Sequence, residues 1–403
     1  MADSEFKQNG ETIDSSVAEE ASETMDVESI LEKYDKESTT RSLTPAWEKL
    51  VKTICILFSL FQLYTAAFGV FEAQIQRSIH MAFMLVLVYL LYPARVSWRK
   101  DGMQIIDVGL AVLGLAVGAY VVYEYVDLMM RAGLPTQYDI IFGAICILLV
   151  LEASRRVVGL PITLVAIVFL AYAYWGPYFP GMFGHRGFGL KRIIAHMYVT
   201  TEGILGTPLG VASTFVYLFI LFGAFLHKTG LGKFFIDLAL AATGHTVGGP
   251  AKVAVLASGL FGTISGSSVA NVVTTGTFTI PLMKSIGYKS EFAAAVEAAA
   301  STGGQLMPPI MGAAAFVMSQ FIGIAYIHIA IAAALPAILY YLAVGLMVHY
   351  EAKRLGLRGI PKERLPDVKK VLAAGWHLLL PLFVIVYLLV QGYTPLRAAF
   401  VCI

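Results

Sequence analysis

Long apolar runs separated by short charged loops dominate this chain. A hydrocarbon core about 30 Å thick requires roughly 20 apolar residues for each crossing helix. In the first half of the sequence, such runs predict spans at Thr53–Phe71, Ser78–Ala94, Val108–Tyr123, Ile140–Leu151 and Val157–Trp175. The fourth run is short and needs its flanks Gln137 and Ser154 to reach across.

The second half continues the pattern after a connector rich in Gly and Pro. Further spans are expected at Leu209–Leu226, Ala325–His349 and Val371–Tyr393. The connector, Gly176–Pro208, contains a short helix predicted to lie in the interface at Leu190–Tyr198, and Phe234–Ala242 is amphipathic and suited to the same position. We therefore expect an all-α, polytopic integral membrane protein.

The composition excludes an ordinary soluble enzyme. Of 403 residues, 58% are hydrophobic and only 14% are charged, against about 25% charged in soluble domains. The first 45 residues carry 12 acidic and 4 basic side chains, and this stretch is predicted to be a disordered cytoplasmic tail. The net charge of +2 is a cancellation between an acidic tail and a basic body, so it does not indicate nucleic-acid binding.

Basic residues predict the orientation, because Lys and Arg concentrate in short cytoplasmic loops. Arg95, Arg99 and Lys100 mark one such loop, and Arg155–Arg156 mark another. The loop 351–370 has seven basic and three acidic residues. These loops place the N-terminus in the cytoplasm.

Residues 251–286 are interpreted as a helical hairpin that enters the membrane and returns. Between Lys252 and Lys284 lie 31 residues without a charge, too many for one span and too few for two. The middle of the run, Gly262–Ser268, is rich in Gly, Ser and Thr. Non-helical backbone at membrane depth is tolerated where protein or a water-filled cavity surrounds it.

A second irregular segment follows the Ala-rich helix predicted at Ser290–Ser301. Glycines and two prolines interrupt the helix before it resumes at Ile310–Ile322, because Pro lacks an amide donor and restricts the preceding residue. The residues of this break are Thr302, Gly303, Gly304, Gln305, Pro308 and Pro309.

These two breaks carry the candidate chemistry. Half-helix N-termini attract anions, and unwound backbone can coordinate Na⁺. We predict a sodium or substrate site at the hairpin tip, formed by Ser265, Gly266, Ser267, Ser268 and Asn271, with Ser265, Ser267, Ser268 and Asn271 as Na⁺ ligands. The alternative is that the small residues only allow close helix packing.

Two ionisable residues within apolar segments need separate interpretation. Glu297 is either a functional intramembrane carboxylate or a residue of the first helical turns that faces cytoplasmic water. His328 is expected to be a packing residue. The three cysteines, Cys55, Cys146 and Cys402, have no metal-ligand spacing, so Na⁺ is the expected metal and no cofactor is predicted.

The segments Gly262–Asn271, Pro281–Lys284 and Thr302–Pro309 resemble the large permease subunit of TRAP transporters, in particular the fused small-plus-large permeases that work with TAXI-type binding proteins. The resemblance covers roughly residues 50–403. It implies Na⁺-driven symport of an organic carboxylate, delivered by a periplasmic solute-binding protein, across the bacterial inner membrane by an elevator-like movement. Asn271 stands where the dicarboxylate branch commonly has Asp.

The resemblance also suggests how the chain is divided. We expect a small-permease-like domain at 46–175, the connector at 176–208, and the first half of the large permease at 209–403. The family has a second, inverted hairpin and break, so we expect the gene to continue past Ile403.

The sequence also allows two other functions. An intramembrane serine protease would use Ser265 as nucleophile and His328 as base, and an activated serine needs that base within hydrogen-bond reach. A structural membrane subunit would leave transport to another chain, but would not need unwound backbone at membrane depth.

Overall fold

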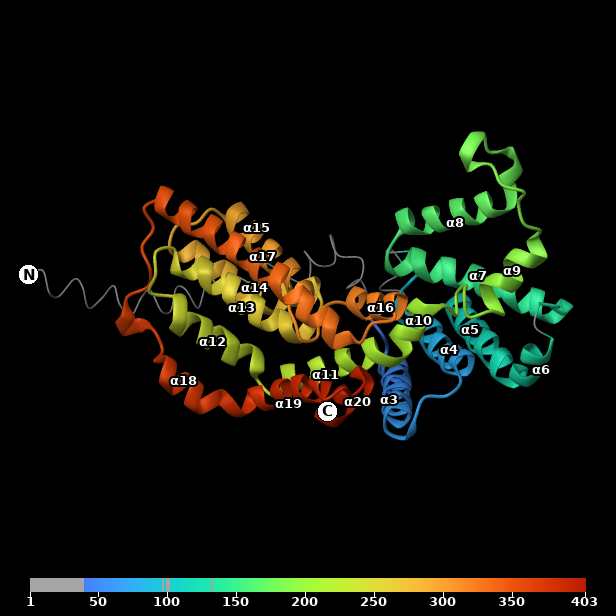
Figure 1. Ribbon diagram of the computed structural model, residues 1–403, viewed down its shortest axis with the longest axis horizontal. Helices are drawn as coiled ribbons and strands as arrows, with labels where there is room; N and C mark the ends of the chain where they lie inside the picture. Colours follow the sequence, from blue (N-terminus) through green and yellow to red (C-terminus); the bar gives the residue numbers. More distant parts are fainter. Residues whose placement is uncertain (1–39, 96–97, 99–101, 132) are drawn as a thin grey trace, which may run out of the picture. The chain divides into compact units, whose positions relative to one another are not determined.

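Helices account for the regular structure of the chain. The computed structural model describes residues 40–95, 98, 102–131 and 133–403, and within these ranges it contains helices and turns but no strand (Figure 1). Most of the predicted tail, together with Arg99 and Lys100, lies outside the described residues. The chain divides into two units: Met1–Phe58 with Phe71–Gly206, and Ser59–Val70 with Thr207–Ile403.

The first unit contains the predicted N-terminal spans. It begins with the first part of α3 (Pro45–Phe68), a helix shared with the second unit. Its other helices are α4 (Ala73–Leu91), α5 (Ile105–Tyr123), α6 (Tyr125–Met130), α7 (Gln137–Val157), α8 (Leu160–Trp175) and α9 (Leu190–Tyr198), with 3₁₀ turns at Gly176–Tyr178 and Gly181–Phe183. The helix predicted at 190–198 is confirmed over the same residues.

Local sequence explains why α7 extends beyond both ends of the apolar run from which it was predicted. Thr136 and Asp139 form a reciprocal capping box at its start, which satisfies amides that the helix itself leaves unpaired. At its other end, Arg155 and Arg156 both bind Glu152, so the helix continues to Val157.

A buried ion cluster lies in the first unit. Asp107 is 1% exposed and accepts hydrogen bonds from Arg156, at 2.8 Å, and from Arg41. The sequence assigned Arg41 to a disordered tail. That assignment is wrong for Arg41, because pairing with a buried carboxylate holds its guanidinium inside the protein.

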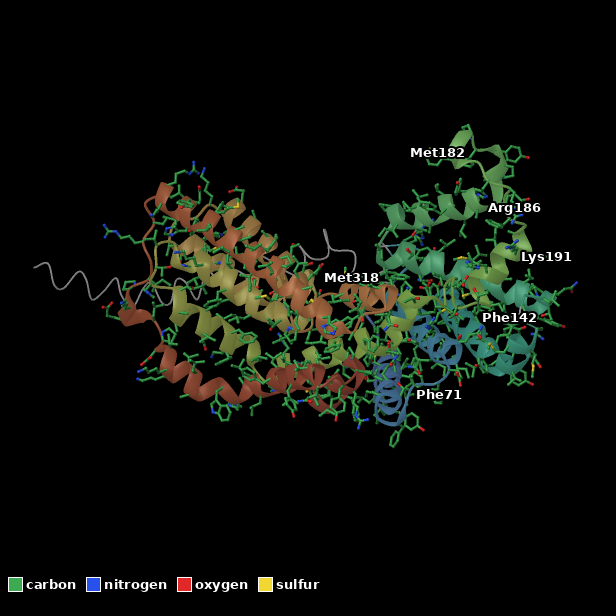
Figure 2. All side chains as sticks on the ribbon, in the orientation of Figure 1. Phe71, Phe142, Met182, Arg186, Lys191 and Met318 are labelled. Atoms are coloured by element: carbon green, nitrogen blue, oxygen red, sulfur yellow. The ribbon has the colours of Figure 1, made fainter. Side chains whose placement is uncertain are left out.

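The connector between α8 and α9 carries exposed side chains. Met182 and Arg186 of this connector are exposed, as is Lys191 at the start of α9 (Figure 2). The following helix is anchored, since the Tyr198 hydroxyl donates to the Val117 carbonyl at 2.7 Å.

The second unit holds both of the predicted irregular segments. Its helices are α10 (Thr207–Val211), α11 (Tyr217–Lys228), α12 (Leu231–Thr243), α13 (Gly249–Ser265), α14 (Ser268–Ser285), α15 (Ser290–Gly303), α16 (Ala313–Ile322), α17 (Tyr326–Arg354), α18 (Val368–Gly375), α19 (Leu380–Val390) and α20 (Pro395–Cys402). A π-helical turn, Ala212–Val216, joins α10 to α11, and 3₁₀ turns occur at Gly304–Leu306, Lys362–Arg364 and Trp376–Leu379.

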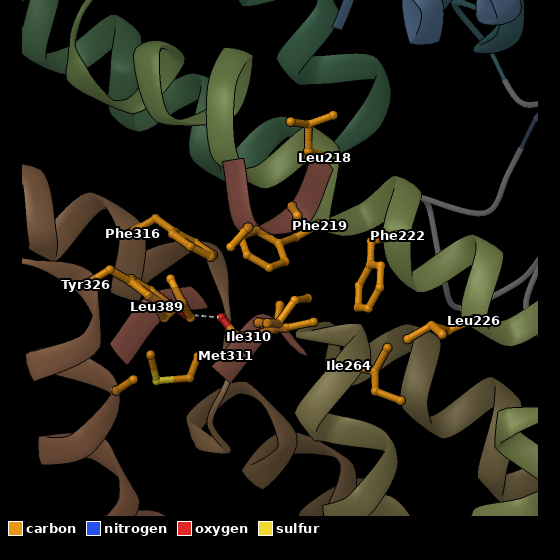
Figure 3. Packing of buried hydrophobic residues seen from close by; sticks show 14 of the residues in the cluster. Leu218, Phe219, Phe222, Leu226, Ile264, Ile310, Met311, Phe316, Tyr326 and Leu389 are labelled. Carbon is orange, nitrogen blue, oxygen red and sulfur yellow. Dashed lines mark hydrogen bonds between the residues drawn. The ribbon is translucent and has the colours of Figure 1, made fainter. Parts of the chain in front are cut away.

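Aromatic residues form the centre of the main apolar core of this unit. Phe316 of α16 stacks on Tyr326 of α17, with ring centroids 4.3 Å apart, and on Phe219 of α11 at 5.1 Å (Figure 3). Leu389 of α19 belongs to the same buried cluster. Such stacked pairs add stability beyond the area that they bury, so α11, α16 and α17 are held together beside the broken segment.

Seven helical stretches of the described residues are long and apolar enough to cross a membrane. They are Pro45–Phe68, Ala73–Leu91, Ile105–Tyr123, Leu160–Tyr178, Thr207–Lys228, Tyr326–Arg354 and Val368–Val390. The polytopic helical class is therefore confirmed. Helix α7 is not among the seven, and its crossing of the membrane stays a prediction.

Candidate functional site

The hairpin predicted at 251–286 is present as α13 and α14. The two helices are joined by Gly266, whose φ of 58° is costly for residues other than glycine, and by Ser267. The Ser267 hydroxyl caps α14 by accepting from the Ala270 amide at 3.3 Å. The entry of this hairpin into a membrane stays a prediction, but the two-helix geometry agrees with the sequence.

The predicted break begins and ends later than expected. Thr302 and Gly303 still belong to α15, and the Thr302 hydroxyl donates back to the Ala298 carbonyl at 2.7 Å. The next helix starts at Ala313 rather than Ile310. Met311, with a φ of 60°, cannot continue a right-handed helix, which explains the later start.

Hairpin and break meet in the second unit. A Cβ on Gly266 would lie 2.1 Å from the Met311 carbonyl oxygen. The Gln305 side-chain amide donates to the Ser268 hydroxyl across 3.0 Å. Residues from the two predicted segments, 37 positions apart in sequence, thus form one surface.

The four predicted sodium ligands occupy two environments. Ser265, Ser267 and Ser268 lie at the tip, where Ser265 reaches the Ser267 carbonyl at 3.4 Å. Asn271 is fully buried, and its amide nitrogen donates to the Ser258 carbonyl of α13 at 2.9 Å. The three serine hydroxyls therefore lie together at the tip. The Asn271 amide instead forms a hydrogen bond between the two arms of the hairpin.

The proline end of the break is fixed by a tyrosine. Pro308 and Pro309 are half-buried, and the Tyr326 hydroxyl lies within hydrogen-bond reach of the carbonyls of Pro309 and Ile310. The Gly312 amide donates to the Gln305 carbonyl at 2.9 Å. These contacts fix the non-helical backbone of the break beside the hairpin tip.

Glu297 does not face water. It is 0% exposed and is surrounded by four hydroxyls, from Ser258, Thr275, Thr279 and Ser301. The water-facing interpretation is wrong, because both arms of the hairpin cover this side chain. Sequence reasoning did not single out those hydroxyl residues. Their signal is the i, i+4 spacing of Thr275 with Thr279 and of Glu297 with Ser301, which puts each pair on one helix face.

The geometry for an activated serine is not present. His328 is exposed near the start of α17, and among the described residues no hydrogen bond links it to Ser265, which instead contacts the Ser267 carbonyl. The nucleophile and base of the protease hypothesis are therefore not paired.

Many apolar helices define a polytopic helical membrane protein, and a two-helix hairpin with a broken helix at its tip is a feature typical of secondary transporters. A family model described as "Tripartite ATP-independent periplasmic transporter, DctM component" matches residues 145–403. The match covers more than half of the chain, so the chain belongs to the DctM family of TRAP transporter large permeases. The matched region begins within α7, upstream of the boundary expected at residue 209.

Curated relatives agree with the family model. The chain is 33% identical over 185 residues to the C4-dicarboxylate TRAP transporter large permease protein DctM of Pseudomonas aeruginosa, covering 45% of this chain and 42% of the relative. It is 27% identical over 264 residues to the Vibrio cholerae protein of the same name, covering 64% and 53%. A third relative, the 2,3-diketo-L-gulonate TRAP transporter large permease protein YiaN of Escherichia coli, is 28% identical over 181 residues, covering 45% and 42%. The chain thus spans about half the length of these relatives, which are named as permeases.

Proposed function

We propose that the permease containing this chain carries out sodium-coupled uptake of an organic carboxylate across the bacterial inner membrane. The substrate is delivered by a periplasmic solute-binding protein of the TAXI type, and the N-terminus is cytoplasmic. Membership of the DctM family supports the transport class, and relatives named for C4-dicarboxylates and 2,3-diketo-L-gulonate support a carboxylate.

The observation that carries the proposal is the contact between hairpin tip and break. The Ser268–Gln305 hydrogen bond brings hydroxyl, amide and irregular backbone groups to one surface. In the proposal, Ser265, Ser267 and Ser268 offer oxygen ligands to Na⁺, with Asn271 bracing the hairpin behind them. The N-terminus of α14 opens at the same tip, and its dipole favours a substrate carboxylate.

The test uses the full-length permease in proteoliposomes together with a purified TAXI-type binding protein from the same organism. An inward sodium gradient should drive uptake from a panel of radiolabelled C4-dicarboxylates and 2-oxo acids. Alanine at Ser265, Ser267 or Ser268 should raise the sodium concentration for half-maximal uptake several-fold. Ser285→Ala is the matched control, because this exposed serine lies at the far end of α14 and donates to the Leu282 carbonyl.

Two results would contradict the proposal. If no panel member is taken up under a sodium gradient, the coupling or the substrate class is wrong. If all three tip variants keep wild-type sodium dependence at normal expression, the hairpin tip is not the sodium site.

A further inference from the structure

A carboxylate enclosed by hydroxyls lies deeper in the hairpin than the tip. Glu297 Oε1 accepts from the Ser258 hydroxyl at 3.0 Å and from the Ser301 hydroxyl at 3.1 Å. Thr275 also contacts Oε1, and Thr279 contacts Oε2. The four partners come from α13, α14 and α15, so this one side chain joins both arms of the hairpin to the helix that leads into the break.

No cationic side chain neutralises this carboxylate within the described residues. On α17, the Tyr341 hydroxyl donates to the Ala300 carbonyl at 2.8 Å. The lysine of α13, Lys252, instead contacts Thr246. Lys284 of α14 and Glu291 of α15 are exposed near the ends of their helices. A buried ion without a counter-ion is costly, so the four hydroxyls are the groups that must stabilise any charge on Glu297.

The surrounding hydroxyls can satisfy either form. A hydroxyl has one hydrogen to donate, and the two threonines each have a second acceptor: Thr275 reaches the Asn271 carbonyl at 2.9 Å, and Thr279 reaches the Thr275 carbonyl at 3.0 Å. When Glu297 is ionised, both hydroxyls can donate to it. When Glu297 is protonated, its own O–H donates to Thr279, and the threonines turn their hydrogens to the helix carbonyls.

The packing favours a proton over a metal ion at this position. The carboxylate and hydroxyl oxygens are in direct hydrogen-bond contact, whereas a central cation would have to separate them. A Cβ on Gly276 would lie 3.0 Å from Glu297 Cγ, so the absent side chain of Gly276 is what admits the glutamate. The four hydroxyls thus surround the carboxyl group directly.

We propose that Glu297 is an exchangeable proton site, separate from the sodium site at the hairpin tip, and that it takes up and releases a proton during transport. This inference rests on the proposed transport function. The step is the transfer of a proton from a hydronium ion to a carboxylate oxygen: one O–H bond of the hydronium breaks as the carboxyl O–H bond forms, water leaves, and release of the proton is the reverse of this step. Because α13 and α14 cover the site, proton exchange requires the hairpin to loosen from α15, which couples the charge of Glu297 to hairpin movement.

Infrared difference spectroscopy tests the site directly. The full-length permease in lipid is moved between alkaline and acidic buffer, and the carbonyl stretch of protonated carboxyl groups is recorded. We expect a buried-carboxyl band that is lost in Glu297→Gln and displaced in frequency in Glu297→Asp. Glu291→Gln, on the exposed side of the same helix, should retain the band. A spectrum of Glu297→Gln identical to wild type would overturn the proposal. If the glutamine variant does not fold, a band of unchanged frequency in Glu297→Asp would overturn it instead.

A second measurement separates this inference from the proposed function. Proteoliposomes loaded with a pH indicator should acidify inside during sodium-driven uptake by the wild-type permease, and Glu297→Gln should lower the number of protons per anion imported. Sodium-driven uptake without acidification would overturn the proton site and leave the proposed function intact. If the permease takes up no carboxylate with sodium but still shows the Glu297-dependent infrared band, the proposed function is wrong and the proton site is supported.

Discussion

Gly262 of α13 lies so close to Gly304 of the broken segment that a Cβ on Gly262 would lie 2.3 Å from the Gly304 Cα. Backbone meets backbone here, so no flexible side chain can yield to an added methyl group. The contact seats the 3₁₀ turn at Gly304–Leu306 against the hairpin. It explains why glycine occurs in both irregular segments.

We expect Gly262→Ala to destabilise the protein by about 1–3 kcal/mol, the usual cost of overpacking a tight interior. Gly345→Ala is the control, because Gly345 is also helical but has nothing within 4 Å of the added Cβ. Thermal unfolding of both purified variants in detergent gives the comparison. If Gly262→Ala melts at the wild-type temperature, the close approach of hairpin and break is not rigid.

Asn271 and Ser265 should respond differently to alanine. The Asn271 side chain is buried and hydrogen-bonded to the Ser258 carbonyl, so its loss should cost about 1–3 kcal/mol through lost bonds and a cavity. Ser265 makes only a long contact at the tip, 3.4 Å to the Ser267 carbonyl. We expect a clear fall in melting temperature for Asn271→Ala and almost none for Ser265→Ala. The opposite order would show that the tip serine, not the amide, braces the hairpin.

The buried ion cluster of the first unit gives a sharper stability test. Asp107→Asn would remove the carboxylate that pairs with buried Arg41 and would leave Arg156 with Glu152 as its carboxylate partner, and breaking a buried pair typically costs about 3–5 kcal/mol. Glu124→Gln removes a partly exposed partner of Arg131 and should cost under about 1 kcal/mol. Comparable melting temperatures for the two variants would mean that the cluster is not an electrostatic anchor.

The helices were predictable where one physical requirement acts along the chain. A crossing helix must be apolar for its whole length. The apolar runs within α3, α4, α5 and α11 therefore predicted these helices without tertiary information. The same rule predicted Val371–Tyr393 as one span, and Val368–Val390 is one of the seven candidate spans. The 3₁₀ turn between α18 and α19 was not predicted, because a continuous and an interrupted helix both satisfy an apolar environment.

The candidate site was predictable in position but not in its partners. Gly and Pro limit where a helix can continue, so the hairpin turn and the break appeared in the sequence within a few residues. Glu297 was left open between water and the interior, because that choice depends on Ser258 and Thr279, which approach it from two other helices. Arg41 is similar: its partner Asp107 is 66 positions away, and a charged stretch next to an acidic tail gives no sign of that pairing.

The last prediction concerns orientation. Loop 351–370, with seven basic residues, should face the cytoplasm, because Lys and Arg in short loops resist translocation, and the connector after α8 should face outward. In a full-length permease lacking Cys55, Cys146 and Cys402, the exposed positions Arg186→Cys and Glu363→Cys report the two sides. An impermeant maleimide should label Arg186→Cys in intact spheroplasts and Glu363→Cys only after permeabilisation. Labelling of Glu363→Cys in intact spheroplasts would reverse the orientation, and with it the side from which the hairpin enters the membrane.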